Sequence, residues 1–122
     1  MGMKARNGND GEWQAVPTEI RGLLRSITRK LIKSYHPKKV ILFGSFARNE
    51  QRRSSDLDLL IIKNTAQPPK TRWMTVRKIL RRFTRQIPIS PMVYTEKELA
   101  ERLAAGDFFI REIVAEGKVL HG

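Results

Sequence analysis

Two short runs of consecutive apolar residues constrain the fold of this chain more than any other feature. Residues 40–43 read Val-Ile-Leu-Phe, and residues 59–62 read Leu-Leu-Ile-Ile. The first run lies in a segment, 38–43, that predicts a strand covered on both faces, and the second predicts another buried strand over 56–62. Strands of this kind need helices packed against the sheet that they form.

Apolar residues spaced three and four apart predict two amphipathic helices. The first spans residues 18–35, with Thr18 as its N-cap, and the second spans residues 73–87. The apolar stripe of the second helix is expected to comprise Trp73, Val76, Ile79, Leu80, Phe83 and Ile87. Its opposite side carries Arg77, Lys78, Arg81, Arg82 and Arg85. That side is either a solvated face or a surface that binds a partner, and the sequence leaves both interpretations open.

The last third of the chain predicts one more strand and two shorter helices. Residues 89–94 suit a strand, and Pro91 within it indicates an edge position or a bulge. Thr95 and Glu98 match a capping box at the start of one helix, and residues 107–116 suit the other. The buried positions of that last helix are expected to be Phe108 or Phe109, Ile113 and Val114. We therefore expect an α+β fold, α/β-like in its order of elements, with a small mixed sheet and helices packed on it.

Length and charge set further limits. A chain of 122 residues suits one domain, and we expect residues 1–15 to be a flexible tail and residues 16–122 to be the domain. The 24 basic and 12 acidic residues give a formal net charge of +12, which favours a polyanion or an acidic partner unless it serves solubility alone. The absence of cysteine excludes disulfides and thiolate metal sites. No apolar run approaches the ~20 residues of a membrane span, so we expect a cytoplasmic protein without membrane contact.

A glycine-serine pair and two aspartates carry the chemistry that we expect. Gly44 and Ser45 directly follow the first predicted strand, where a sharp turn and a helix start offer amide donors to a phosphate. Asp56 and Asp58 open the second strand, where residues two apart share a face with their α-carbons about 6.6 Å from each other. Two such carboxylates need a cation, and Mg²⁺ is bound by one or two carboxylates together with phosphate oxygens.

Each half of this motif has an ordinary structural explanation when it is taken alone. Gly44 and Ser45 suit any turn from a strand into a helix, whereas Asp56 and Asp58 suit an N-cap or an ion pair at the start of a strand. The two halves occur together and in order, one after a buried strand and the other before the next. This arrangement favours a site for metal and phosphate.

The sequence resembles the DNA polymerase β-like nucleotidyltransferase superfamily, and within it the minimal nucleotidyltransferases. The pattern of that group is Gly-Ser, then Ala-Arg-Gly, a variable stretch, and Ser-Asp-x-Asp-Leu. The matching residues here are Gly44, Ser45, Ala47, Arg48, Ser55, Asp56, Asp58 and Leu59. Asn49 replaces the family glycine and also tolerates a positive φ. The resemblance extends from about Val40 to Leu120.

The resemblance implies a polymerase β-like fold and an enzyme that transfers a nucleoside monophosphate from ATP, or a related nucleoside triphosphate, to a hydroxyl acceptor. It implies that Asp56 and Asp58 are the catalytic residues and bind Mg²⁺. The candidate nucleotide-binding residues are Gly44, Ser45, Arg48 and Ser55. Members of this group often act beside a small helical partner of the HEPN type, as the antitoxin of a toxin-antitoxin pair.

The third acidic position of the family is the departure that bears on activity. Ser90 occupies that place on the third strand, and no acidic residue lies between Leu59 and Thr95. Serine is a poor base and a weak Mg²⁺ ligand. Two other functions therefore stay open. One is a catalytically weakened protein that binds a nucleotide or a partner, and the other is a nucleic-acid-binding module, which the charge permits but no recognised motif supports.

Overall fold

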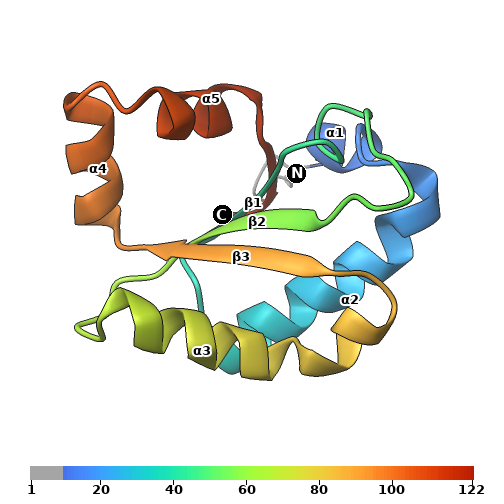
Figure 1. Ribbon diagram of the computed structural model, residues 1–122, viewed down its shortest axis with the longest axis horizontal. Helices are drawn as coiled ribbons and strands as arrows, with labels where there is room; N and C mark the ends of the chain where they lie inside the picture. The colour runs from blue at the N-terminus through green and yellow to red at the C-terminus, as the bar shows by residue number, and fades with distance from the viewer. Residues whose placement is uncertain (1–9) are drawn as a thin grey trace, which may run out of the picture.

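The structure is a computed structural model that describes residues 10–122 (Figure 1). These residues form four strands, β1 (Lys39–Phe43), β2 (Leu57–Ile62), β3 (Ile89–Tyr94) and β4 (Lys118–His121). They also form five α-helices, α1 (Asp10–Gln14), α2 (Thr18–Tyr35), α3 (Pro69–Ile79), α4 (Glu96–Ala104) and α5 (Phe108–Glu116). A short 3₁₀ helix, η1 (Arg81–Arg85), follows α3. Within this part of the chain, no helix is long and apolar enough to cross a bilayer.

The strands form one mixed sheet in the order β3-β2-β1-β4. β1 is antiparallel to both β2 and β4, whereas β2 and β3 are parallel. β3 thus lies at an edge of the sheet, which is the position that Pro91 predicts, because proline lacks an N–H to donate to a second neighbour. The mixed sheet with its helices confirms the α+β fold class. The sequence prediction omits β4, whose four residues include only one that is fully buried, Leu120.

Helices cover both faces of the sheet. Figure 1 shows α2 and α3 on one face and α4 and α5 on the other. Leu42 and Leu59 belong to the core beneath α2 and α3, whereas Ile41 and Leu60 belong to a second core with α4 and α5. Successive strand residues point to opposite faces, so a strand with a helix layer on each side needs an unbroken apolar run. This requirement explains both runs in the sequence.

Residues 10–14 form a helix, α1, inside the segment that we expected to be a flexible tail. The indole Nε1 of Trp13 donates a hydrogen bond to the Leu120 carbonyl at 3.3 Å, and the Glu12 carboxylate accepts one from the Val119 amide at 2.6 Å. Both bonds join residues far apart in the sequence, which local patterns do not reveal. The tail expectation is therefore wrong for residues 10–15, and its remainder, residues 1–9, lies outside the described part of the chain.

Two helices bury different residues from those predicted. α3 ends at Ile79 instead of near residue 87, and its inner face includes the Arg72 side chain, which is 4% exposed, while Trp73 is 43% exposed. α5 is anchored by Ile110 and Ile113. The expected core residues of α5 that are largely exposed are Phe108, Phe109 and Val114. In both helices the exposed apolar residues lie next to the buried stripe. Spacing of three and four residues therefore does not distinguish them from the buried ones.

The helix starts differ in how they are capped. Thr18 is the first residue of α2 and makes no cap, because the N-cap position is Pro17. At α4, the Thr95 hydroxyl accepts a hydrogen bond from the Glu98 amide, and the Glu98 side chain accepts one from the Thr95 amide, as the predicted capping box requires. Asp107 caps α5 through the Ile110 amide.

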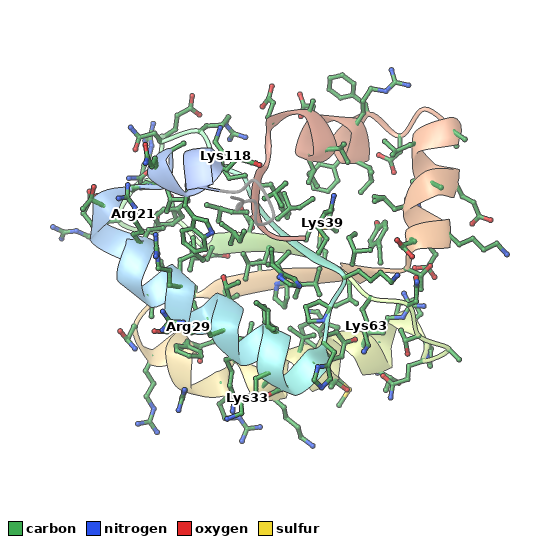
Figure 2. The ribbon with its side chains drawn as sticks, turned by 180° about the vertical axis from the view of Figure 1, so that it is seen from behind. Arg21, Arg29, Lys33, Lys39, Lys63 and Lys118 are labelled. Carbon is green, nitrogen blue, oxygen red and sulfur yellow. The ribbon has the colours of Figure 1, made fainter. Side chains whose placement is uncertain are left out.

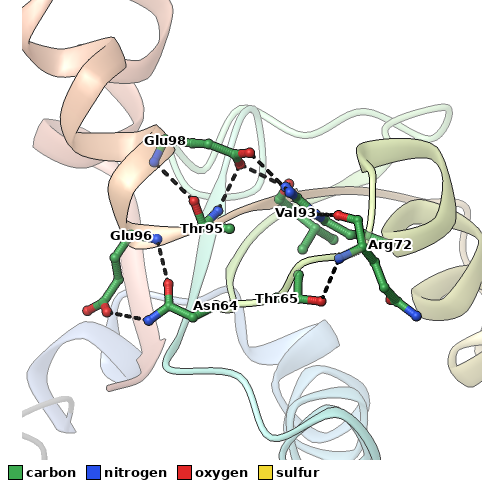
Figure 3. A network of polar contacts seen from close by, with 8 residues as sticks. Asn64, Thr65, Arg72, Val93, Thr95, Glu96 and Glu98 are labelled. Carbon is green, nitrogen blue, oxygen red and sulfur yellow. Dashed lines mark hydrogen bonds and ion pairs between the residues drawn. The ribbon is translucent and has the colours of Figure 1, made fainter.

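A polar network joins α3, β3 and α4 (Figure 3). The Arg72 guanidinium donates to both carboxylate oxygens of Glu98, at 2.7 and 3.0 Å, and to the Gln67 carbonyl at 2.7 Å. It also reaches the Val93 carbonyl at 3.4 Å. We call Arg72, Thr95 and Glu98 the Arg72 network. Because the arginine is buried and its donors are used, the network fixes α3 against the end of β3.

Candidate functional site

The turn after β1 depends on a glycine. Gly44 has a φ of +76°, and a β-carbon at this position would overlap with the Asp58 carboxylate. The Gly44 carbonyl accepts hydrogen bonds from the Ala47 and Arg48 amides, at 3.1 and 3.2 Å. Glycine therefore serves two purposes here: it permits the left-handed backbone, and it lets the turn lie directly against β2.

The amides at the start of this turn have no hydrogen-bond acceptor within the described residues. Among the hydrogen bonds of residues 10–122, the amides of Ser45 and Phe46 donate to no other protein group. The segment forms a single turn and not the helix start that we expected, because it ends at Asn49, whose φ is +58°. Asn49 thus adopts the positive φ that the family pattern assigns to glycine. Adjacent unbonded amides at a turn form a concave site for an anion.

Asp56, Asp58 and Ser90 lie together at one end of the sheet. Asp58 is opposite Phe43 in the β1 pairing and beside Ser90 in the β3 pairing. The Ser90 Oγ donates a hydrogen bond to Asp56 Oδ2 at 3.1 Å. Because β2 and β3 are parallel, their first residues lie at the same end of the sheet. The expectation that Ser90 faces the same site as the two aspartates is confirmed.

The electrostatic environment of Asp58 is unfavourable for its charge. Its pKa is raised, first by burial and then by the neighbouring charge of Asp56, whereas the Arg48 guanidinium acts in the opposite direction. Within the described residues, the Asp58 carboxylate takes part in no hydrogen bond or ion pair. A half-buried carboxylate of this kind gains from a bound cation or a bound donor.

Arg48 and Ser55, the other two candidate nucleotide-binding residues, flank the site. Arg48 is exposed, and its Nε donates to Glu50 Oε1 at 2.9 Å, a bond that raises the arginine pKa. The Ser55 Oγ accepts a hydrogen bond from the Arg52 amide at 2.7 Å. Arg48 also lines the cavity described below, whereas Ser55 shapes the loop before β2.

A cavity of about 300 Å³ lies over Gly44 and Asp58. One wall comes from Phe43, Gly44, Arg48 and Asp58. The opposite wall comes from α5, through Phe109, Glu112 and Glu116. The rings of Phe43 and Phe109 make an edge-to-face contact with centroids 5.9 Å apart. The site is therefore a cleft between the Gly44 turn and α5, with aromatic and acidic side chains on both walls, and we call it the Asp58 cleft.

The contribution of α5 was missed in the sequence analysis. Phe109, Glu112 and Glu116 are spaced three and four apart, so they share one helix face. That spacing was a usable signal, but the sequence analysis predicted Phe109 only as a candidate for the core and assigned no role to the two glutamates. Only the packing of α5 across the end of β1 brings the three residues to the cleft.

The donor set of the cleft fits a hard divalent cation. Within the described residues, no group of three or more histidine, cysteine, aspartate or glutamate side chains is arranged to hold a metal ion. Asp58 lines the cleft, and Asp56 is close enough for its charge to act on Asp58. Two carboxylates suffice for Mg²⁺ only when substrate phosphates and water complete its shell. Since Asp58, Glu112 and Glu116 make the cleft acidic, a triphosphate would enter more favourably with a cation than without one.

Comparisons with known families and proteins identify the family of this chain. The family described as "Polymerase beta, Nucleotidyltransferase" matches residues 25–122. Two proteins of Methanocaldococcus jannaschii that carry the provisional name protein adenylyltransferase are 46% and 39% identical to this chain over 44 residues. Those residues are 36% of this chain and 45% and 51% of the two relatives. The match with these curated relatives thus spans about half of their length.

A solved structure has a similar fold. It is a protein of Sulfolobus solfataricus, provisionally described as a nucleotidyltransferase, with a TM-score of 0.51 and 21% sequence identity. The alignment covers 82% of this chain and 85% of the other. At this identity the likeness concerns the fold alone.

Proposed function

The chain belongs to the polymerase beta nucleotidyltransferase family, and we propose that it transfers a nucleoside monophosphate from ATP, or a related nucleoside triphosphate, to a hydroxyl acceptor. The acceptor oxygen forms a bond to the α-phosphorus, the bond from that phosphorus to the bridging oxygen breaks, and pyrophosphate leaves. The acceptor proton passes to a base or to water. Such a reaction depends mainly on positioning and on neutralising charge.

The observation that carries the proposal is the environment of Asp58. This carboxylate is half-buried, lies against Gly44 and beside Asp56, and has a raised pKa. Burial of a carboxylate without a partner disfavours folding, so its placement needs an explanation from function. A cation with a triphosphate would account for both aspartates and for the two unbonded amides of the Gly44 turn.

Each candidate residue has a distinct role in this proposal. The Ser45 and Phe46 amides bind phosphate oxygens beyond Gly44, and Arg48 neutralises part of the triphosphate charge. Ser55 holds the loop that precedes Asp56. Asp56 and Asp58 would hold Mg²⁺, which would stabilise the charge on the phosphates during transfer.

We further propose that the acceptor is a protein. The basis is the provisional name of the Methanocaldococcus relatives, protein adenylyltransferase. The resemblance to minimal nucleotidyltransferases adds a specific candidate, a helical HEPN-type toxin for which this chain would be the antitoxin. Both the ATP preference and this pairing are part of the proposal.

A second function is favoured by one observation, the serine at the third acidic position. Ser90 donates a hydrogen bond to Asp56 and adds no negative charge to the site. A site with two carboxylates suits binding of a metal-triphosphate complex, but it lacks a base for the acceptor hydroxyl. The alternative is therefore a protein on the same fold that binds nucleotide or partner and transfers slowly.

The experiment that separates these functions uses ATP labelled on the α-phosphate. The purified chain is incubated with Mg²⁺ and a candidate HEPN-type protein, and labelled protein is detected after denaturing electrophoresis. Nucleotidyl transfer gives label from α-labelled ATP and none from γ-labelled ATP. If calorimetry shows Mg-ATP binding but no protein acquires label, the binding function is favoured. If neither binding nor label is seen, both proposals are wrong.

A further inference from the structure

The longest stretch of the chain without an acidic residue forms a strongly basic surface. Between Leu59 and Thr95 the basic residues are Lys63, Lys70, Arg72, Arg77, Lys78, Arg81, Arg82 and Arg85. Arg72 is paired with Glu98, but the five on the outer side of α3 and η1 make no ion pair within the described residues. Unpaired positive charges clustered on one surface attract an acidic ligand.

This surface also contains a groove with apolar side chains. A cavity of about 640 Å³ runs along α3 and η1, and we call it the α3 groove. It is lined by Trp73, Met74, Arg77, Lys78 and Arg81, together with three threonines. Trp73 and Met74 are 43% and 52% exposed. Large apolar side chains this exposed on one helix face indicate a binding surface when basic residues surround them.

The basic surface continues onto the neighbouring helix. A second hollow, of about 400 Å³, shares Lys78 and Arg81 with the α3 groove and reaches Lys30 on α2. Figure 2 shows Arg29 and Lys33 along α2 as well. The whole surface lies on the face of the sheet that α2 and α3 cover, opposite α5 and the Asp58 cleft (Figure 1). It is therefore separate from the candidate active site.

The residue types favour a protein as the occupant over a nucleic acid. The Arg77 guanidinium lies 4.9 Å from the centre of the Trp73 ring, so one face of the ring is already covered. Single-stranded nucleic acids bind by stacking successive bases on several aromatic rings, whereas Trp73 is the one aromatic residue among those that line the groove. Tryptophan, methionine and arginine are instead the residues enriched in the buried centres of protein interfaces.

We propose that the α3 groove is a docking surface for an acidic amphipathic helix of a partner protein. α3 has 11 residues and is about 16 Å long, from the helix rise. A helix lying along it meets Trp73 and Met74 with apolar side chains and meets Arg77, Lys78 and Arg81 with carboxylates. The proposal does not depend on nucleotidyl transfer, because the surface shares no residue with the Asp58 cleft.

The test uses a designed peptide of about 18 residues, with glutamates on one helical face and leucines on the other. The controls are a peptide of the same composition in scrambled order and a single-stranded oligouridylate. Binding is followed by the fluorescence anisotropy of the labelled peptide. In a second assay it is followed by the emission of a dye attached to the protein at Thr75→Cys, a specific labelling site because the chain has no other cysteine. The same dye at Ala104→Cys on α4 reports binding elsewhere.

We expect the amphipathic peptide to bind and to change the fluorescence of the dye at position 75. The fluorescence of the dye at position 104 should stay unchanged. Arg77→Gln with Arg81→Gln should weaken binding about tenfold or more at low salt, and Trp73→Ala should weaken it as well. The matched control, Lys97→Gln with Arg111→Gln, removes the same charge from α4 and α5 and should change affinity less than about twofold. Thermal unfolding checks that each variant is folded.

Four results would overturn the proposal. The first is that the peptide does not bind. The second is that the scrambled peptide binds equally well, so that charge alone is responsible. The third is that the oligouridylate binds more tightly and loses affinity in the Arg77 and Arg81 variant, which would make the groove a nucleic-acid surface. The fourth is an equal loss in the Lys97 and Arg111 control.

Discussion

Glu98, in the first turn of α4, and Asp58, on β2, are both partly shielded carboxylates. Their surroundings shift the carboxyl pKa in opposite directions. Glu98 accepts two hydrogen bonds from Arg72 and one from the Thr95 amide, and its pKa falls to about 2. The pKa of Asp58 is raised by burial and by Asp56. The Arg72 network uses its charges to stabilise the fold, whereas the Asp58 cleft keeps charge that the fold does not satisfy.

This difference distinguishes a structural carboxylate from a functional one. A buried charge with all its partners present is explained by the fold that it holds together. A charge held without partners lowers stability, and in the proposed function Asp58 is retained for the cation that binds there. Neutralising the carboxylate should therefore have opposite effects on stability and on activity in the two regions.

The largest effect is expected from neutralising the two carboxylates in turn. Asp58→Asn should lower nucleotidyl transfer on the order of 10³-fold, because an amide cannot replace a carboxylate on a hard cation. It should leave the free energy of unfolding unchanged or higher at neutral pH. Radiolabel transfer and urea unfolding measure the two quantities.

Glu98→Gln is the matched control for that substitution and should behave in the opposite way. We expect transfer within a few-fold of wild type in the folded protein and a loss of about 1–2 kcal/mol in the free energy of unfolding, because Arg72 loses its charged partner. If Asp58→Asn destabilised the protein more than Glu98→Gln, the distinction between the two regions would be wrong.

Ser90→Asp tests whether the cleft lacks a third carboxylate. We expect transfer to rise about 10²-fold, the lower end of general-base assistance, with little change in triphosphate affinity. Without a divalent cation the new charge beside Asp56 and Asp58 should lower the free energy of unfolding, and Mg²⁺ should restore it. A wild-type protein that already transfers quickly, with Ser90→Asp neutral or harmful, would show that the base comes from elsewhere.

Gly44→Ala tests the contact between the turn and Asp58. The substitution introduces both a positive-φ alanine and an overlap with the Asp58 carboxylate, so we expect a loss of about 3 kcal/mol. Gly106→Ala is the matched control, since Gly106 has a φ of +80° and a β-carbon there would meet only Arg111 Nη2, at an ordinary contact distance of 3.9 Å. Its expected loss is about 1 kcal/mol. Equal losses, measured by urea unfolding, would show that only the backbone conformation matters at Gly44.

The smallest effect is expected in the pH dependence of stability. The pKa of Glu98 is lowered from 4.5 to about 2, so its stabilisation is present above the unfolded pKa and is lost as the pH falls toward 2. The pKa of Asp58 is raised from 3.8, so its contribution is greatest below that value and is lost as the pH rises through the folded pKa.

The two carboxylate variants should therefore diverge from wild type in opposite directions as the pH rises from about 2 to about 7. Relative to wild type, Glu98→Gln becomes less stable and Asp58→Asn becomes more stable. Unfolding curves over this range measure both differences. Parallel curves for the two variants would contradict the assigned directions of the pKa shifts.

The elements with a strong local signal were predictable from the sequence. The apolar runs located β1 and β2, and the Gly-Ser and Asp-x-Asp spacing located the turn and the carboxylates. Tertiary contacts determined the rest. α1 is held by β4, across more than a hundred residues, and α5 brings Glu112 to the cleft only by packing across β1. Trp73 is exposed because Arg72 takes the inner position to reach Glu98.

The hydrogen bond between Glu12 and the Val119 amide has a consequence for self-association. β4 is an outer strand of the sheet, and an outer strand with open amides can recruit a strand from another molecule. Glu12 occupies the Val119 amide at 2.6 Å, and Trp13 bonds to the neighbouring Leu120 carbonyl. At the other outer strand, Pro91 has no amide hydrogen to offer. Each outer strand thus lacks a free amide at one position, which disfavours addition of a strand from another molecule there.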